Sequence, residues 1–110
     1  MIHAVIFENK REECTGFQVE GHAGYSEEGQ DIVCAAASML VMNTVNAIDM
    51  FTEDTFSFIS DEDEGIISCH FTETPSHDAG LLLNTMIMGL SDMANDENYK
   101  EYIDLTFEEV

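Results

Sequence analysis

A histidine and a cysteine lie twelve residues apart, at the ends of a glycine-rich segment of this 110-residue chain. His22 follows Gly21, and Cys34 ends the run Gly29-Gln30-Asp31-Ile32-Val33-Cys34. A thiol becomes a nucleophile by losing its proton, and both a nearby imidazole and the start of a helix favour the thiolate. These residue types and their spacing indicate nucleophilic catalysis by Cys34, with His22 as the base.

Residues 21–30, which include His22, are predicted to form a surface loop. It contains Gly21, Gly24 and Gly29 and shows neither strand alternation nor a helical stripe, so its backbone has unusual freedom. Tyr25 in this loop either walls a substrate pocket or packs beneath the loop. We expect the loop to move without substrate and to become ordered when substrate binds.

Asp31 is predicted to be the N-cap of a long helix, because aspartate is a preferred capping residue. Cys34 then stands in the first turn, where unpaired N–H groups and the helix dipole stabilise a negative charge. Backbone N–H groups of Cys34 or Ala35, together with the Gln30 amide, are the expected donors to the tetrahedral oxyanion. Asp31 can also orient His22, and both roles for its carboxylate stay open.

The same motif resembles that of the bacterial ribosomal-processing cysteine proteases. The resemblance rests on GHAGY at residues 21–25 and on GQDIVCAA at residues 29–36, followed by a serine. It implies a homodimer that removes the N-terminal extension of a basic large-subunit ribosomal protein, with no metal and no cofactor. The candidate site comprises the dyad of His22 and Cys34, the supporting Asp31 and Gln30, and the substrate-loop residues Gly21, Gly24, Tyr25, Gly29 and Ser38.

Alternating and helical patterns predict the elements that position this site. A long helix is predicted from Asp31 to about Phe51, and a second opens at Thr74-Pro75-Ser76 and ends near Asn95. The order ββαββαβ predicts an α+β fold, a two-layer sandwich with both helices on one face of a mainly antiparallel sheet. We expect residues 1–110 to form a single cysteine protease domain. The predicted strands are Ile2–Phe7, Thr15–Glu20, Thr55–Ser60, Ile66–Phe71 and Tyr102–Phe107.

The first predicted helix is apolar on nearly every side. One stripe of residues at helical spacing faces a sheet, while methionines occupy other faces. Because one sheet covers only one side of a helix, the outward methionines predict contact with the second helix or a homodimer surface. The stripe contains Val33, Ala37, Leu40, Thr44, Ile48 and Phe51, and the outward methionines are Met39, Met42 and Met50.

The composition constrains partners and compartment. A formal net charge of -20 argues against direct binding to nucleic acid, and it fits either a basic substrate or solubility alone. Asn43 and Asn46 interrupt the apolar stretches, and the N-terminus lacks the pattern of a secretion signal, so we expect a cytoplasmic protein that does not enter the membrane. Three irregularly spaced cysteines predict neither a disulfide framework nor a four-cysteine zinc site.

Other candidate sites and functions are weaker. Asp61–Gly65 is interpreted as a hairpin turn in preference to a calcium loop. Cys69 and His70 are adjacent on a strand and point to opposite faces. Two rival functions stay open. One is a non-catalytic acidic module that binds a basic ribosomal protein, with Cys34 buried and inert. The other is a thiol-redox protein that pairs Cys34 with Cys14 or Cys69.

Overall fold

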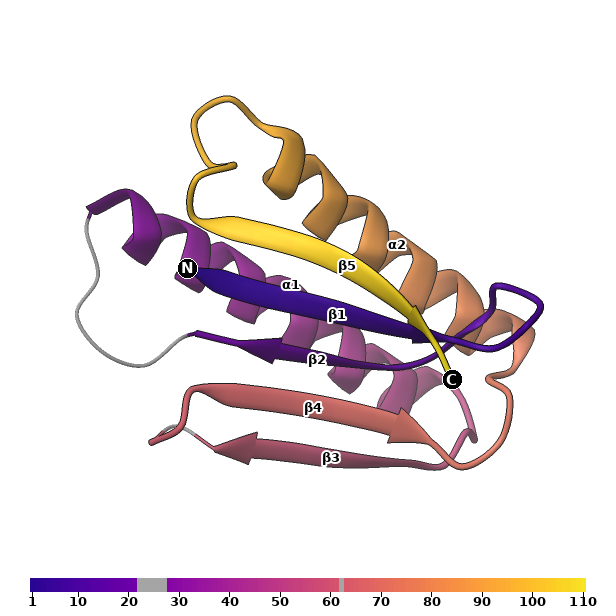
Figure 1. Cartoon of the computed structure of the whole chain (residues 1–110). Helices are drawn as coiled ribbons and strands as arrows, with labels where there is room; N and C mark the ends of the chain where they lie inside the picture. The colour runs from indigo at the N-terminus through magenta and orange to yellow at the C-terminus, as the bar shows by residue number, and fades with distance from the viewer. Residues whose placement is uncertain (22–27, 62) are drawn as a thin grey trace.

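The computed structural model contains a five-stranded mixed sheet with two helices packed on one face (Figure 1). It describes residues 1–21, 28–61 and 63–110, and the side chains of the first helix from Ile32 onward. The elements are β1 (Ile2–Glu8), β2 (Cys14–Glu20), α1 (Glu28–Phe51), β3 (Phe56–Asp61), β4 (Ile66–Phe71), α2 (His77–Asn95) and β5 (Ile103–Glu109). The strands lie in the order β3-β4-β2-β1-β5, and every neighbouring pair is antiparallel except β1 with β5. The predicted α+β sandwich and its order ββαββαβ are confirmed.

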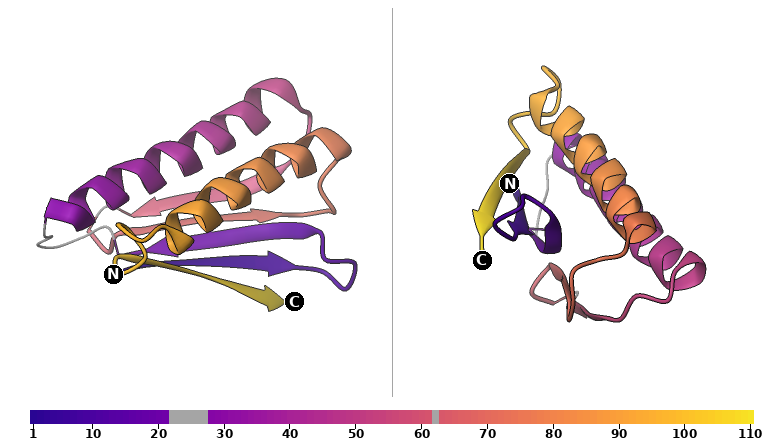
Figure 2. Two further views of the ribbon diagram at one scale, coloured as in Figure 1. Left: turned by 90° about the horizontal axis from the view of Figure 1, so that it is seen from above. Right: turned by 90° about the vertical axis from the view of Figure 1, so that its right-hand side faces the viewer.

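Both helices cover the same face because of how they connect the strands. α1 links β2 to β3, α2 links β4 to β5, and the two strands of each linked pair are parallel. A right-handed crossover, usual for parallel strands, places its helix on a face set by the direction of the starting strand and by the direction of the crossover across the sheet. The starting strands β2 and β4 are antiparallel, and the two crossovers also run in opposite directions. Because both factors are reversed, the two helices lie on the same face. Figure 2 shows the resulting two layers.

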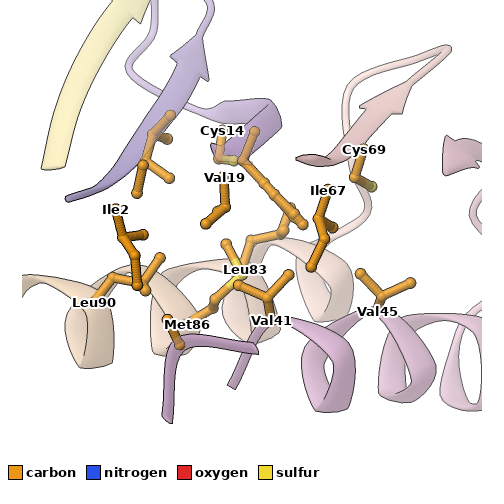
Figure 3. Packing of buried hydrophobic residues seen from close by; sticks show 14 of the residues in the cluster. Ile2, Cys14, Val19, Val41, Val45, Ile67, Cys69, Leu83, Met86 and Leu90 are labelled. Carbon is orange, nitrogen blue, oxygen red and sulfur yellow. The ribbon is translucent and has the colours of Figure 1, made fainter. Parts of the chain in front are cut away.

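The hydrophobic core lies between the sheet and the two helices (Figure 3). Ile2, Ala4 and Ile6 of β1 and Phe17 and Val19 of β2 are fully buried at alternate positions. This is the pattern expected of strands with one covered face. The helices contribute Val33, Ala37, Val41, Val45 and Ile48 from α1 and Ala79, Leu83, Met86 and Leu90 from α2.

The buried stripe of each helix differs from the predicted one. In α1, Val41 is fully buried where the sequence predicts Leu40, and Phe51 at the end of the predicted stripe is 72% exposed. In α2, the helical spacing of apolar residues predicts a stripe through Ala79, Leu82 and Met86, but Leu83 is buried in place of Leu82. Neighbouring apolar residues satisfy the helical spacing almost equally well, so packing against the sheet selects which of them is buried.

Ser76 is the N-cap of α2, in agreement with the predicted helix start. Its hydroxyl accepts the N–H of Ala79 at 3.2 Å and donates to the carboxylate of Asp54 at 2.6 Å. The Ser76 N–H donates to the same carboxylate at 2.7 Å, and these hydrogen bonds lower the pKa of Asp54. The contact ties the chain after α1 to the beginning of α2.

The apolar composition of α1 also bears on the membrane prediction. By length and composition alone, Ile32–Phe51 is able to cross a bilayer, with a mean hydropathy of 1.5. The sequence interpretation that its apolar stretch is too interrupted is therefore not supported. The core helix of a soluble protein passes the same test, and α1 packs Val33, Val41 and Ile48 against the sheet. Core packing accounts for this buried stripe, whereas Met39, Met50 and Phe51 are exposed.

Candidate active site

Cys34 lines a groove between α1 and the β3–β4 hairpin. Its side chain is partly buried, and the groove has a volume of about 310 Å³. Cys34, Ser38 and Met42 form the helical wall, because residues four apart lie on one face of a helix. The hairpin supplies the other wall, formed by Ser60, Asp61, Gly65, Ile66 and Ile67.

The groove combines apolar surface with a few polar groups. Met42 and two isoleucines supply the apolar lining, and the side chains of Ser38 and Asp61 supply polar groups. Within the described chain, Asp61 is the only charged residue that lines the groove. Such a mixture suits a peptide, whose side chains need apolar surface and whose backbone needs hydrogen-bonding partners.

Ser38, a predicted substrate contact, lies in the groove with Cys34. Met42 is predicted at a dimer surface, but it lines the groove and packs against the core. Sequence reasoning missed the hairpin wall, because it interprets Asp61–Gly65 only as a turn. The turn itself can be predicted from its glycine and acidic residues. The position of the turn beside α1 cannot be predicted in this way, because no local spacing of residues encodes that contact.

α1 begins at Glu28, three residues before the predicted N-cap, so the capping role of Asp31 is wrong. Cys34 is therefore the seventh residue of the helix and lies beyond the first turn. Gly29, which the sequence predicts in the loop, lies inside the helix. A glycine costs a helix only about 1 kcal/mol, so Gly29 does not prevent the helix from beginning before it.

The earlier start also removes two predicted oxyanion donors. Only the first four N–H groups of an α-helix lack an intrahelical partner. The N–H groups of Cys34 and Ala35 come later in α1 and are directed at carbonyl groups one turn earlier. The prediction that they bind an oxyanion is therefore wrong. The side chains of Gln30 and Asp31 lie outside the described atoms, and their roles at the site stay predictions.

Strand β2 ends beside the hairpin wall of the groove. Glu20 pairs with Ile66 in the β2–β4 ladder, and the Gly21 N–H donates to the Gly65 carbonyl at 3.1 Å. The end of β2, the start of α1 and the β3–β4 turn lie at one end of the molecule (Figure 1). Three predicted site residues follow in the segment 22–27, outside the described residues: His22, Gly24 and Tyr25. Their roles stay predictions.

The other two cysteines are buried in the core. Burial raises the pKa of the Cys14 thiol, and the carboxylate of Glu8 adds to the increase. Burial likewise raises the pKa of Cys69 to about 12. Since the thiolate is the nucleophilic form, both thiols are poorly reactive near neutral pH.

A larger cavity, of about 460 Å³, has both Cys14 and His77 in its lining. The Cys14 residue is only 6% exposed, and its burial together with the carboxylate of Glu8 raises the pKa of its thiol. His77 contacts the carboxylate of Asp78 at 3.3 Å. Despite its size, this cavity presents no accessible thiol, and the groove beside α1 is the better candidate active site.

A partly buried thiol in a groove of mixed polarity on this α+β sandwich is compatible with a cysteine nucleophile. Comparison with known families identifies the class of protein, because the profile of the cysteine protease Prp family matches residues 1–104. The chain belongs to this family and is a cysteine protease.

Characterised relatives match along nearly the whole chain. The ribosomal processing cysteine protease Prp of Staphylococcus aureus is 34% identical over 107 residues, which cover 97% of this chain and 99% of the relative. The protein of the same name from Bacillus subtilis is 31% identical over 110 residues, 96% of each chain. The crystal structure of the S. aureus protease in complex with a substrate peptide superposes with a TM-score of 0.92 at 31% identity. That match covers 98% of this chain and 100% of the other.

Proposed function

We propose that Cys34 and His22 form the catalytic dyad of a sequence-specific endopeptidase. The observation that carries this proposal is the position of Cys34 in a groove of about 310 Å³, while Cys14 and Cys69 are buried. His22 directly follows Gly21, whose N–H contacts the hairpin wall of the same groove. The residue before His22 is therefore hydrogen-bonded to a wall of the groove that Cys34 lines.

In the proposed mechanism, His22 takes the proton of the Cys34 thiol, and the sulfur attacks the carbonyl carbon of the scissile peptide bond. His22 then returns the proton to the leaving amine, and water hydrolyses the acyl-enzyme to release the second product. The Gln30 amide donates a hydrogen bond to the oxyanion. Asp31 orients His22, a role favoured by a helix that begins before it. These steps need neither a metal nor a cofactor.

The remaining residues of the motif are proposed to hold the substrate. Gly21, Gly24 and Tyr25 form the loop against which the peptide lies, and Gly29 allows close approach at the start of α1. Ser38 offers a hydroxyl in the groove, one turn from Cys34. A peptide then lies between the loop and the hairpin, with its scissile bond over the sulfur.

The proposed substrate is the N-terminal extension of a basic large-subunit ribosomal protein. The relatives are named ribosomal processing proteases, and a net charge of -20 attracts a basic protein over long range. The same charge repels ribosomal RNA, which favours cleavage before the substrate joins the ribosome. We further propose that residues 1–110 act as one protease domain, in the cytoplasm and as a homodimer.

The two rival functions fit the structure less well. A non-catalytic acidic module requires Cys34 to be buried and inert, yet Cys34 lines a groove. A thiol-redox protein requires Cys34 to pair with Cys14 or Cys69, and burial raises the pKa of both. Their protonated thiols are poor partners for disulfide exchange.

The test is mass spectrometry of the basic ribosomal protein after incubation with this chain. The wild-type protein should remove the N-terminal extension, and Cys34→Ala and His22→Ala should each leave it intact. Cys14→Ala is the matched control, because it removes a thiol that plays no part in the reaction, and it should cleave at a rate close to that of the wild type. Cleavage by Cys34→Ala near the wild-type rate would remove the proposed mechanism.

A further inference from the structure

Two glycine residues join the strand that leads to His22 with the hairpin beside Cys34. The Gly21 N–H donates to the Gly65 carbonyl at 3.1 Å. Gly21 directly follows β2, and Gly65 directly precedes β4 and lines the groove. One backbone hydrogen bond therefore connects the end of β2 to a wall of the candidate active site.

The local backbone favours glycine at both positions. Gly21 has a φ of 106° and Gly65 a φ of 65°, in the region that L-residues with a Cβ rarely adopt. A Cβ at Gly21 would also overlap the carbonyl oxygen of Met1 and lie 3.1 Å from the Ile2 Cα. Because both obstacles are backbone atoms, a larger residue at position 21 must move the end of β2.

The hairpin turn is held by contacts on both sides of Gly65. On one side, Asp61 accepts the Glu64 N–H through its carboxylate at 3.1 Å. On the other, Ile66 pairs with Asp61 in the β3–β4 ladder and with Glu20 in the β2–β4 ladder. A shift at Gly65 is therefore transmitted to Asp61 and Ile66, which both line the groove.

We propose that Gly65 is a positioning residue for catalysis, acting through its hydrogen bond with Gly21. This hydrogen bond fixes the position of the hairpin wall relative to Gly21, the residue that precedes His22. This inference rests on the proposed Cys34–His22 dyad, because the bond fixes the residue before His22 against a wall of the groove that Cys34 lines. An error of about 1 Å in such a register lowers the rate about 100-fold.

The first experiment compares Gly21→Ala, Gly65→Ala and the double variant in cleavage of the basic ribosomal protein. Each single variant should lower kcat by about 10- to 100-fold with a smaller change in KM. Because both substitutions disrupt the same contact, the double variant should lose no more than the worse single variant. Losses in kcat that multiply would show that the two glycines act separately, and they would overturn the inference.

Two other glycines provide matched controls for the effect of an added methyl group. Gly80 in α2 has nothing within 4 Å of an added Cβ, so Gly80→Ala should leave the kinetics unchanged. At Gly89, an added Cβ would lie 2.7 Å from Leu40 Cδ2, the movable end of a side chain, so Gly89→Ala should shift the Leu40 side chain at small cost, away from the groove. If Gly89→Ala lowers both the melting temperature and kcat as much as Gly65→Ala does, Gly65 acts only through stability.

A second measurement separates failure of this inference from failure of the proposed function. Alkylation of Cys34 by iodoacetamide at neutral pH, without substrate, should be about tenfold slower in His22→Ala and in Gly65→Ala than in the wild type. If His22→Ala alkylates as fast as the wild type, the proposed dyad is wrong. If Cys34 is alkylated slowly in His22→Ala but at the wild-type rate in Gly21→Ala and Gly65→Ala, the proposed dyad is supported and the positioning role of Gly65 is wrong.

Discussion

Cys34 and Ser38 lie one turn apart on α1 and line the same groove. A leucine in place of Ser38 would fill part of a space of only about 310 Å³. We expect Ser38→Leu to raise KM about 10- to 100-fold, in line with the cost of overpacking a fitted site. The effect on kcat should be smaller, since Ser38 takes no part in proton transfer. Steady-state kinetics on the ribosomal substrate measure both.

The control for this substitution is Thr85→Leu, which adds leucine to an exposed position of α2 outside the groove. Its KM should stay within about twofold of the wild-type value, because a surface change away from the site alters binding little. Equal KM values for Ser38→Leu and the wild type would mean that the peptide does not occupy this groove.

The buried thiol of Cys69 should make the free energy of unfolding depend on pH in the alkaline range. Burial raises its pKa from 9.0 to about 12 in the folded protein, so the unfolded chain loses this proton first as the pH rises. The stabilisation is fully present below about pH 9 and is lost as the pH approaches 12. Urea unfolding should therefore show the free energy of unfolding falling over this range. In Cys69→Ala the free energy of unfolding should fall less steeply with pH. This comparison of slopes does not depend on how much the lost side chain lowers stability at neutral pH. Parallel curves for the two proteins would contradict the assignment.

Asp61 should contribute to recognition of a basic substrate, because it is the charged residue of the groove lining within the described chain. Asp61→Asn is expected to lower kcat/KM about two- to fivefold, the value of one exposed ion pair. The loss should shrink as salt is added, because salt screens exposed charges. The kinetics are measured with the full basic protein and with an uncharged peptide of the same scissile sequence.

Asp63→Asn is the matched control, since it removes the same charge from the same turn but outside the groove lining. It should leave kcat/KM for both substrates almost unchanged at moderate salt. If Asp61→Asn and Asp63→Asn reduce cleavage equally, the acidic surface acts only through its total charge and Asp61 has no specific role.

The outer face of α1 should form the contact of a homodimer. Met39 is 71% exposed and Met50 is 75% exposed, although both are large and apolar. Glutamate at either position would place a charge in such a contact, so Met39→Glu and Met50→Glu should convert a dimer into monomers. Sedimentation velocity at micromolar concentration measures the change.

Ile59→Glu is the control for the dimer prediction, because Ile59 is 60% exposed but belongs to β3 in the other layer. It should sediment like the wild type. A wild-type protein that is monomeric, or a loss of the dimer only in Ile59→Glu, would exclude the α1 contact.

Local patterns were sufficient for most of the secondary structure. Alternation of apolar residues located all five strands to within about two residues, and Ser76 marked the start of α2. These features are readable because each depends on neighbouring residues and on backbone preferences. The start of α1 was less readable, since Asp31 is a good capping residue while Gly29 is tolerated in a helix at modest cost.

Part of the candidate site was also predictable from local sequence, and part was not. The sequence alone singled out His22 and Cys34 as candidates, because their residue types and the glycine-rich segment between them suit thiol chemistry. Ser38 was also readable, as part of the motif that continues from Cys34. Local spacing did not reveal that the β3–β4 turn forms the other wall of the groove.

Only the tertiary structure decided which apolar residues are buried and which residues meet. Val41 is buried in preference to Leu40 because the sheet determines how α1 is rotated about its axis. Met42 faces the groove for the same reason, while Met39 stays exposed. The contact between Gly21 and Gly65 depends on β2 lying next to β4, a pairing between residues far apart in the chain. Long-range packing of this kind leaves no local pattern, because its energy comes from surfaces that come together only in the complete fold.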